Sequence, residues 1–564
     1  MHSIGTPYSF ALRHLLRCPM HNSSRLVRQL ITLVRNSGYL RPDHAMAVAG
    51  NILDARPLPD AFAILSPALI RHAALFDPFD REKLRLAEDV NSRVPHEPFT
   101  QWVDSARRLT DMDPVPEYIT APDPSTASPE TFVQYIREQP SNDNRFSAIL
   151  HLWQTGAEKA FLEAVQIITA SPSGLLAAPV MAWGAYAANQ ADLAGMLLDE
   201  GARTFQSINL RARMALDNGA TKQGIDLLRK SLDMEPFQPA IIEQLASLEH
   251  PSSPAPTADT HICLYTWNKP DTLIQTITSL AQTDIGDAQI TILNNGTTTS
   301  SPAALEQRVR EAAPQLSIRW LHLPVNVGVP AARNWLLADE QVRQCNYVAF
   351  LDDVLLPPDW LTRFHSTLAR FPKAAAIGAK CLNAPMRTLQ YAFRNFEEVG
   401  EQTVRLTAKT PTLMDMGQFD APRPCLSVMG CCHLLDRKKL ESHNVPDFDI
   451  RFSPSQVDDI EHDLQIWKAG TQVIYDGGVQ VVHLQDTGKA PSQAAIGQAY
   501  ANHYKMERKF SLTDLKQMDE AVKAADEKAF RQALHAVLPT ITGSARVFWQ
   551  TLAPLLRTIK KANR

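Results

Sequence analysis

A short apolar run that ends in two acidic residues constrains the fold of this chain more than any other feature. Residues Tyr347–Leu351 have the length and β-rich composition of a buried strand, and Asp352 and Asp353 follow directly. Acids at the carboxyl end of a buried strand lie where open α/β sheets bind their ligands. Their oxygens suit Mg²⁺ or Mn²⁺ that carries a substrate phosphate. A solvated acidic turn is the alternative for these two residues taken alone.

Strands and helices alternate around this run. Pro357 and Pro358 stop regular structure, and Asp359 can cap a helix that begins at Trp360. Further runs of strand length lie at 261–266, 289–293 and 318–323, with helical segments between them. This rhythm with short links predicts an α/β domain with a mostly parallel sheet and helices on both faces.

The chain of 564 residues is too long for one hydrophobic core. We expect a mainly helical region at 1–128, a helical domain at 129–250, a Pro- and Ser-rich linker at 251–259, the α/β domain at 260–490 and a C-terminal helical extension at 491–564. Within residues 1–120 the pattern is irregular, and helical periodicity is visible at 24–36 and 62–75.

One helix pair stands out in the second helical region. In residues 212–236 apolar side chains recur at helical spacing, Gly219 falls in the turn, and Pro236 ends the second helix. This resembles a tetratricopeptide-type hairpin, and stacks of such hairpins bind partner proteins. A helical cap that only packs on the next domain is the alternative.

Composition narrows the class of protein. The formal net charge of −4 gives no reason to expect nucleic acid as a partner. The seven scattered cysteines contain no CxxC pair and fit a reducing compartment. Neither a signal peptide nor ~18 consecutive apolar residues is present. We therefore expect a cytoplasmic protein.

Five motifs in order point to a family. A strand ends in Tyr-Thr-Trp-Asn-Lys, the next ends in Asn-Asn-Gly-Thr, and Asn-Val-Gly-Val-Pro-Ala-Ala-Arg-Asn and Phe-Leu-Asp-Asp-Val follow. In residues 448–470 an acidic pair then opens a helix that ends at a glycine. Over residues 259–490 the chain resembles the inverting family 2-type glycosyltransferases with the GT-A fold.

The resemblance implies a nucleoside-diphosphate sugar as donor, with uridine as the expected base. Thr266 and Asn268 would line the base and ribose pocket, and Arg333 would contact base or phosphate. The family usually carries an Asp that contacts the base where this chain has Asn294 and Asn295. An amide offers donors as well as acceptors, so this departure affects the choice of base.

The resemblance also implies a metal site. Asp353, with Asp352, would hold Mn²⁺ or Mg²⁺ against the leaving diphosphate, and Asp352 would also contact the nucleotide. His483, after the apolar run 479–482, matches a histidine that often completes the site, although a structural role is the alternative. The family's Asp-x-Asp before a Val is shortened to Asp352-Asp353-Val354, which we interpret as a deletion, not as replacement of the last Asp.

The acidic helix would supply the base. By resemblance Asp459, with Asp458 as second candidate, takes the proton of the acceptor hydroxyl. One base and in-line attack imply a single displacement with inversion. An acidic first turn on a solvated helix is the alternative, because the helix dipole favours carboxylates there.

We therefore expect a metal-dependent transferase that moves a sugar to a hydroxyl of a glycan, lipid-linked or protein acceptor, as in polysaccharide biosynthesis. Residues 545–564 would either rest on an anionic membrane surface, at the inner face of the membrane, or pack on the protein. One alternative is a non-catalytic helical-repeat adaptor with a degenerate transferase-like domain. A nucleotidyltransferase is another, but it would not explain the acidic helix from Asp458.

Overall fold

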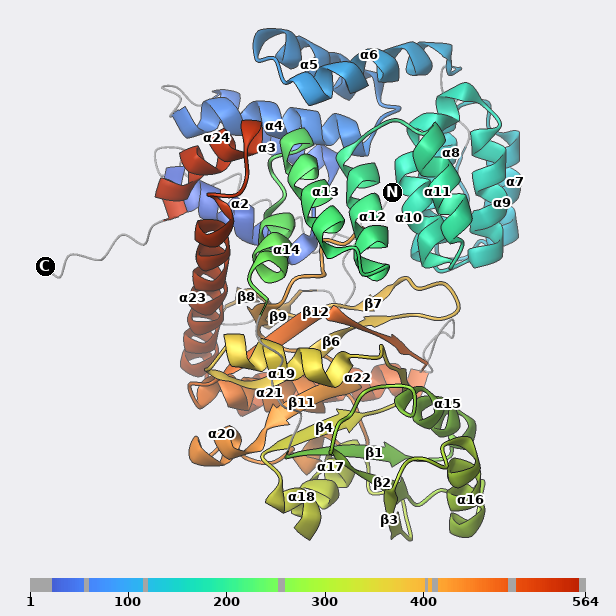
Figure 1. The fold of residues 1–564 in the computed structure, drawn as a ribbon, viewed down its shortest axis with the longest axis vertical. Helices are drawn as coiled ribbons and strands as arrows, with labels where there is room; N and C mark the ends of the chain where they lie inside the picture. Colours follow the sequence, from blue (N-terminus) through green and yellow to red (C-terminus); the bar gives the residue numbers. More distant parts are fainter. Residues whose placement is uncertain are drawn as a thin grey trace, which may run out of the picture.

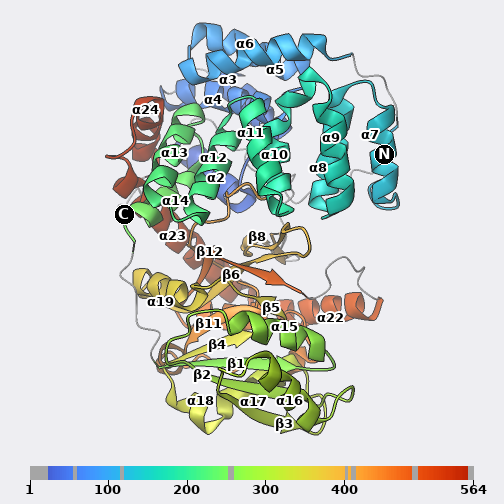
Figure 2. The same ribbon diagram turned by 45° about the vertical axis from the view of Figure 1, so that its right-hand side comes forward.

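The computed structural model describes residues 23–54, 60–114, 120–251, 259–400, 404–407, 414–484 and 493–556. Helices form one layer, and it lies over the β12 side of a sheet that carries its own helices (Figures 1 and 2). The helices of the upper layer, with one short 3-10 turn, are α2 (Ser23–Ser37), α3 (Pro42–Asp54), α4 (Asp60–Phe76), α5 (Arg81–Arg93), α6 (Glu97–Met112), α7 (Pro129–Glu138), α8 (Asn142–Gln154), α9 (Glu158–Thr169), η1 (Pro172–Leu176), α10 (Ala178–Ala187), α11 (Ala191–Glu200), α12 (Phe205–Asp217), α13 (Thr221–Met234) and α14 (Pro239–Glu249).

The expected helical character of the N-terminal region is confirmed, because α2–α6 occupy most of its described residues and extend beyond the two segments with visible helical periodicity. The prolines of this region suggest breaks between helices, but several of them lie within helices. Pro42 and Pro98 lie in first helical turns, where a missing N–H costs nothing, and Pro67 lies inside α4.

The predicted hairpin at 212–236 is confirmed as the pair α12 and α13. Gly219 has φ +76° in the turn between them, a backbone conformation that glycine adopts without strain. The tetratricopeptide assignment itself stays a prediction.

The sheet has the order β10-β12-β6-β11-β4-β1-β2-β3, with β5 paired to β12 and β7 paired to β6. Strands β3, β2, β1 and β4 are parallel, whereas β11, β10, β5 and β7 pair antiparallel to their neighbours. The strands are β1 (Thr260–Thr266), β2 (Gln289–Asn295), β3 (Ile318–Leu323), β4 (Tyr347–Leu351), β5 (Val354–Leu355), β6 (Ala374–Leu382), β7 (Leu389–Tyr391), β10 (Arg423–Cys425), β11 (Cys432–Asp436) and β12 (Gln472–His483), and β8 (Phe396–Val399) and β9 (Val404–Leu406) form a separate hairpin.

Helices cover both faces of this sheet, so the predicted α/β fold class with flanking helical regions is confirmed. One apolar core contains side chains of α15, α16 and α19, and the other contains side chains of α17, α20 and α21. Helix α19 begins at Trp360 as predicted, but Asp359 makes no side-chain cap and instead accepts a hydrogen bond from Arg363 (2.5 Å). The bounds are α15 (Pro270–Leu280), α16 (Pro302–Ala312), α17 (Val329–Ala338), α18 (Glu340–Gln344), α19 (Trp360–Arg370), α20 (Arg437–Ser442), η2 (Ile450–Phe452) and α21 (Asp458–Lys468).

Helix α23 connects the two layers. It follows α22 (Gln493–Lys509) and runs from Leu512 to Val537, about 39 Å at 1.5 Å per residue. Its first half packs in a sheet core through Met518 and Val522, and its second half packs in the helical core through Phe530 and Leu534. Figure 1 shows it along one side of the molecule.

The C-terminal apolar residues follow α23 back into the helical layer. Helix α24 (Gly543–Leu552) and the turn η3 (Ala553–Leu556) bury Phe548, Trp549 and Leu556 there. Trp549 donates a hydrogen bond to the Pro236 carbonyl (2.9 Å). The described part of the predicted membrane-contacting segment therefore packs on the protein, and residues 557–564 lie outside the described residues.

A buried ion cluster fastens the layers together. The Asp526 carboxylate of α23 accepts hydrogen bonds from Arg35 of α2 (2.7 and 2.8 Å) and from Arg423 of β10 (2.6 and 3.1 Å). Arg35 also binds Glu243 of α14 (3.2 Å). We name these four side chains the junction cluster. All are at most 7% exposed, so removal of one member would leave a buried charge without its partner.

Candidate active site

The two acids of the strand end lie beside the end of β12. Asp353 has φ +53°, which turns the chain sharply from β4 into β5. Val354 of β5 pairs with His483, and the Leu484 N–H donates to the Asp353 carbonyl (2.8 Å). The three predicted metal ligands, Asp352, Asp353 and His483, therefore come from neighbouring strand ends.

The residues at this point fit a divalent cation that arrives with a nucleotide. Burial and the neighbouring Asp353 charge raise the pKa of Asp352 to about 7, so a cation would relieve the repulsion between the two acids. Among the described residues no three His, Cys, Asp or Glu side chains gather to hold a metal by themselves. Magnesium sites in nucleotide enzymes commonly use one or two carboxylates and complete the shell with phosphate and water. That Asp352 and Asp353 supply these carboxylates stays a prediction.

Two side chains at this point have other partners. Lys269, which follows β1, donates to the Asp353 carboxylate (2.8 Å). The sequence alone gives no partner for Lys269. The imidazole Nδ1 of His483 lies 2.7 Å from the Gln390 side-chain oxygen. Coordination by His483 stays a prediction.

The acidic helix α21 begins after a strained segment in which Gln456 and Val457 have positive φ. Asp458 is buried and accepts a hydrogen bond from Arg333 (2.7 Å), and burial raises its pKa to about 6 although Arg333 opposes this. Asp459 is half-buried and accepts a hydrogen bond from the Gly430 N–H (3.2 Å). Asp458 is therefore an internal anchor, and Asp459 is the more accessible acid.

Arg333 connects the acids of α21 to β1. It is 3% exposed and donates to the Tyr265 hydroxyl (2.9 Å) and the Gly430 carbonyl (2.9 Å), so it is an internal residue and not part of the helix surface. The Tyr265 hydroxyl in turn hydrogen-bonds Asp352. A Cβ atom on Gly430 would lie 2.5 Å from an Arg333 nitrogen, which explains why glycine stands there. Contact of Arg333 with a nucleotide stays a prediction.

Gly430 and Cys431 join the two acidic pairs. The Gly430 N–H binds Asp459, and the Cys431 carbonyl accepts a hydrogen bond from the Asp352 N–H (2.8 Å). Consecutive residues thus hold one acid from each pair, so both pairs lie at one edge of the sheet.

The amides on the donor side are held by protein groups. Asn294 donates toward His322 (3.2 Å) and accepts from the Thr297 N–H (3.0 Å). Asn295 donates to Asn326 (2.9 Å) and accepts from Val327 (3.0 Å).

Each of these amides uses a donor and an acceptor, which a carboxylate could not do. The Asn268 oxygen accepts from the N–H of Thr298 (2.7 Å), and Thr266 is buried at the end of β1. Their contacts with a nucleotide stay predictions.

A family model matches part of the chain. Residues 261–443 match the family model of glycosyl transferase family 2. This segment is a family 2 glycosyltransferase domain. The predicted resemblance is thereby confirmed for the segment, which contains the acids of β4 and most of the sheet.

Two similar solved structures are themselves transferases. GalNAc-T7 with UDP, GalNAc and Mn²⁺ is 11% identical, with a TM-score of 0.33 over 50% of this chain and 57% of that chain, less than two thirds of its length. The mannosyltransferase PcManGT from Pyrobaculum calidifontis, in complex with GDP-Man and Mn²⁺, is 16% identical, with a TM-score of 0.33 over 59% of this chain and 96% of that chain. No curated protein matches the sequence significantly.

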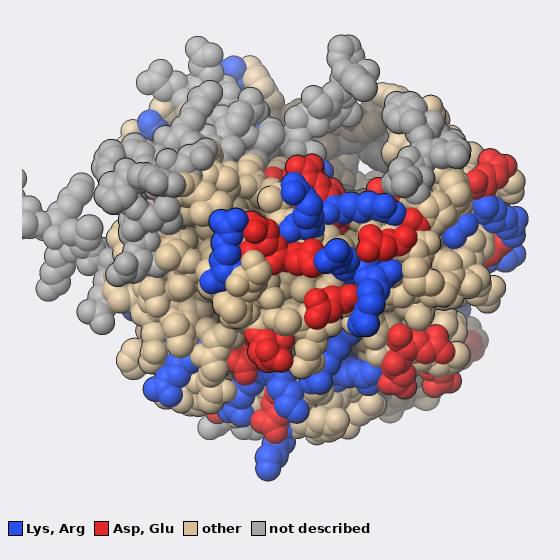
Figure 3. All heavy atoms as spheres, turned by 90° about the horizontal axis from the view of Figure 1, so that it is seen from above, with Lys and Arg blue, Asp and Glu red and all other residues tan. Residues whose placement is uncertain are grey.

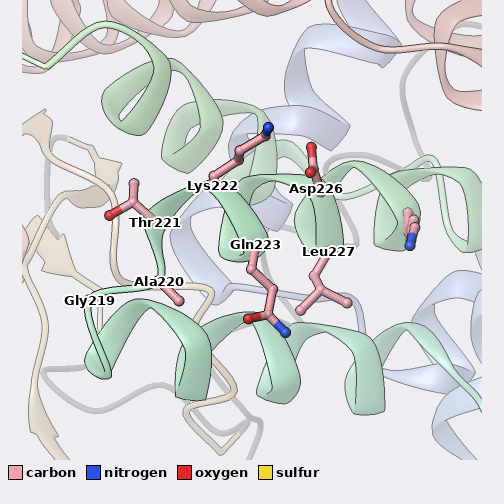
Figure 4. A pocket seen from close by; sticks show the side chains of 8 residues that line it. Gly219, Ala220, Thr221, Lys222, Gln223, Asp226 and Leu227 are labelled. Atoms are coloured by element: carbon pink, nitrogen blue, oxygen red, sulfur yellow. The ribbon is translucent and has the colours of Figure 1, made fainter.

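The described residues of the helical layer present charges of both signs to solvent. Figure 3 shows basic and acidic side chains interspersed on its upper face. An open hollow lies at the α12–α13 turn, but Figure 4 shows Gln223 and Leu227 directed toward α12 and Lys222 and Asp226 directed away from it. No helix within the described ranges is long and apolar enough to cross a membrane.

Proposed function

We propose that the chain transfers a sugar from a nucleoside-diphosphate donor, with uridine as the expected base, to an acceptor hydroxyl with inversion at the anomeric carbon. One observation carries the proposal. Gly430 and Cys431, neighbours in the chain, bind Asp459 and Asp352, one acid from each of the two pairs. A base and a diphosphate-binding acid beside one crevice are what a single displacement requires.

In this reaction Asp459 accepts the proton of the acceptor hydroxyl as its oxygen bonds to the anomeric carbon. The bond from that carbon to the diphosphate breaks, and its electron pair leaves with the diphosphate. Asp458 positions α21 through Arg333 and does not itself take the proton. Asp352 and Asp353, with His483 as a further proposed ligand, would hold Mn²⁺ or Mg²⁺, which stabilises the charge on the departing diphosphate.

Acceptor, partners and location belong to the same proposal. We expect a glycan, lipid-linked or protein acceptor, as in polysaccharide synthesis, at the cytoplasmic side of a membrane or in the cytoplasm. The helical layer would bind that acceptor or a protein partner.

Calorimetry and donor hydrolysis test the proposal without a known acceptor. The full chain is titrated with nucleoside diphosphates in Mn²⁺ or in EDTA, and slow transfer of the sugar to water is then followed with the sugar nucleotide that binds. We expect one nucleotide to bind only with metal. Asp353→Asn should abolish this binding, whereas Asp459→Asn should keep it and lose hydrolysis.

Each other outcome has a defined meaning. Equal binding in EDTA would exclude the metal role of Asp353. Absence of binding to any nucleotide would overturn the transferase proposal and favour the adaptor. If donor hydrolysis survives in Asp459→Asn but is lost in Asp458→Asn, Asp458 is the base and Asp459 is not.

A further inference from the structure

The ammonium group of Lys269 already binds one of the acids that a cation would need. Lys269 follows β1, and its Nζ atom donates to a carboxylate oxygen of Asp353 (2.8 Å). The Asp353 side chain is only 9% exposed, whereas the Lys269 side chain is 41% exposed. A buried carboxylate is therefore paired with a lysine that also faces solvent.

Lys269 supplies positive charge at this end of the sheet. Asp352 and Asp353 bring two acidic groups to the end of β4, and like charges this close repel each other. Arg333, the cation beside the acidic helix, is bound to Asp458 (2.7 Å). Among the residues that the structure describes, Lys269 alone forms an ion pair with Asp352 or Asp353. Its ammonium group thus does what a divalent cation would do at these acids, with half the charge.

The main chain at Lys269 is fixed, but its ammonium group can move. The neighbouring Asn268 donates its N–H to the Thr297 hydroxyl (3.2 Å) and accepts a hydrogen bond from the Thr298 N–H (2.7 Å). Lys269 directly precedes α15. A lysine side chain has a flexible four-carbon stem and a compact charge with rotatable donors. The ammonium group can therefore pass from one oxyanion to another while the main chain stays in place.

Lys269 and Asp353 belong to neighbouring strand ends. Strands β1 and β4 are parallel partners, with Leu264 opposite Leu351. Lys269 follows the first strand, and Asp353 follows the second. Open α/β sheets bind nucleotides in the crevice outside these carboxyl ends. A diphosphate that binds at Asp353 would therefore lie beside Lys269.

The proposed transfer reaction offers Lys269 a second oxyanion. The two phosphates of a sugar nucleotide carry two negative charges, and the departing diphosphate gains a third when its bond to the sugar breaks. A divalent cation offsets two of these charges. A positioned ammonium group stabilises the third, and it acts most strongly where charge develops in a site from which water is excluded.

We propose that Lys269 exchanges partners during the reaction. Before the donor binds, its ammonium group pairs with Asp353 in the place of a divalent cation. When the donor binds together with Mn²⁺ or Mg²⁺, Lys269 releases Asp353 and binds the diphosphate. The inference rests on the proposed transfer reaction. It makes Lys269 a competitor of the cation alone and a partner of the cation with its nucleotide, so the protein holds the metal tightly only when the nucleotide is present.

Binding of Mn²⁺ and of nucleotide, measured separately with the full chain, tests this exchange. Electron paramagnetic resonance measures the binding of Mn²⁺ alone, and calorimetry measures the binding of the nucleoside diphosphate in saturating Mn²⁺. Lys269→Met removes the charge and keeps the length of the side chain. We expect this variant to bind Mn²⁺ alone about threefold more tightly, since a competing ion pair is lost, and the nucleoside diphosphate about tenfold more weakly.

Two further variants serve as controls. Lys222→Met, at an exposed position of α13 that Figure 4 shows directed away from α12, should match the unchanged protein in both measurements. Lys269→Arg keeps the positive charge and should retain part of the nucleotide affinity. Thermal unfolding of each variant shows whether the fold is preserved.

Two results would overturn the exchange. Equal or weaker binding of Mn²⁺ alone in Lys269→Met would show that the lysine does not compete with the cation. Unchanged nucleotide affinity in that variant would show that the diphosphate does not bind Lys269. Failure of the unchanged protein to bind any nucleotide is a separate result, because it does not depend on residue 269. It would overturn the transfer reaction and with it the second partner of Lys269.

Discussion

Arg333 illustrates what a single residue contributes to this site. Its guanidinium binds Asp458, Tyr265 and the Gly430 carbonyl, so it connects β1 to the acidic helix through buried contacts. The sequence predicted that Arg333 belongs to the site but not that it is internal. Arg333 is buried because α21, β1 and the segment at Gly430 meet around it. These segments are distant in the sequence, so no local pattern near residue 333 predicts the burial.

A pH dependence follows from Asp352. Its pKa is raised to about 7, so at lower pH a proton occupies the carboxylate and competes with a cation. We expect metal-dependent nucleotide affinity to rise by up to about tenfold per pH unit below pH 7 and to level off above it. Calorimetry between pH 5.5 and 8.5 measures this. Asp352→Asn should remove the dependence, and a slope that persists in that variant would contradict the assignment.

Gly430 gives a second prediction at this scale. A Cβ atom there would lie 2.5 Å from Arg333, so Gly430→Ala must displace the guanidinium at a cost of ~1–3 kcal/mol. Because the Gly430 N–H also binds Asp459, donor hydrolysis should fall about tenfold or more, which corresponds to ~1.4 kcal/mol.

Gly195→Ala is the matched control for that variant, since nothing lies within 4 Å of the added atom. Thermal unfolding and nucleotide affinity distinguish a local effect from general loss of structure. Unchanged hydrolysis in Gly430→Ala would show that the Arg333–Gly430–Asp459 contacts do not position the base.

At the scale of elements, the sheet strands were the most predictable part. Runs of apolar residues between polar ends predicted β1, β2, β3 and β4 to within two residues. Strands β1, β2 and β4 are buried along nearly their whole length, whereas the edge strand β3 is only partly buried. The helices α3, α5 and α6 escaped prediction; α3 and α6 have prolines in their first turns, which resemble breaks in the sequence. The pairing of β5 with β12, which brings His483 to Asp353, is a long-range contact that sequence periodicity cannot reveal.

Asp526 of α23 is the residue at which the junction cluster can be tested. Asp526→Asn removes the carboxylate that binds Arg35 and Arg423 and leaves two buried guanidinium groups without it. Breaking a buried ion pair costs ~3–5 kcal/mol, so thermal unfolding should begin several degrees lower.

Asp519 of the same helix offers the control. It pairs with the exposed Lys523, and such a pair contributes less than ~1 kcal/mol. Asp519→Asn should therefore leave the unfolding temperature almost unchanged. Equal unfolding temperatures for the two variants would mean that the junction cluster does not hold the layers together.

For the whole molecule, the predicted order of helical, α/β and helical regions agrees with the described elements. The division into separate domains remains a prediction, because apolar side chains of the C-terminal helices share a core with those of residues 26–246. Composition marked the change of pattern near residue 251 but carried no information on which segments pack together afterwards.

Cleavage within the predicted linker tests how the layers hold together. A protease site introduced between residues 252 and 258 would separate the chain into two pieces. We expect both pieces to elute together in gel filtration, since α23 packs on α14 and β10 and carries Asp526 into the junction cluster. Elution as two separate species would contradict this.

The contact between Arg35 and Asp526 also has a consequence for biosynthesis. A ribosome makes residue 35 long before residue 526, at ~5–20 residues per second, so the partner of this arginine emerges ~25–100 s later. Until then the helical layer lacks both the Asp526 carboxylate and the apolar side chains of α23 that complete its core. Slow translation of the last quarter of the chain should therefore lower the yield of folded protein.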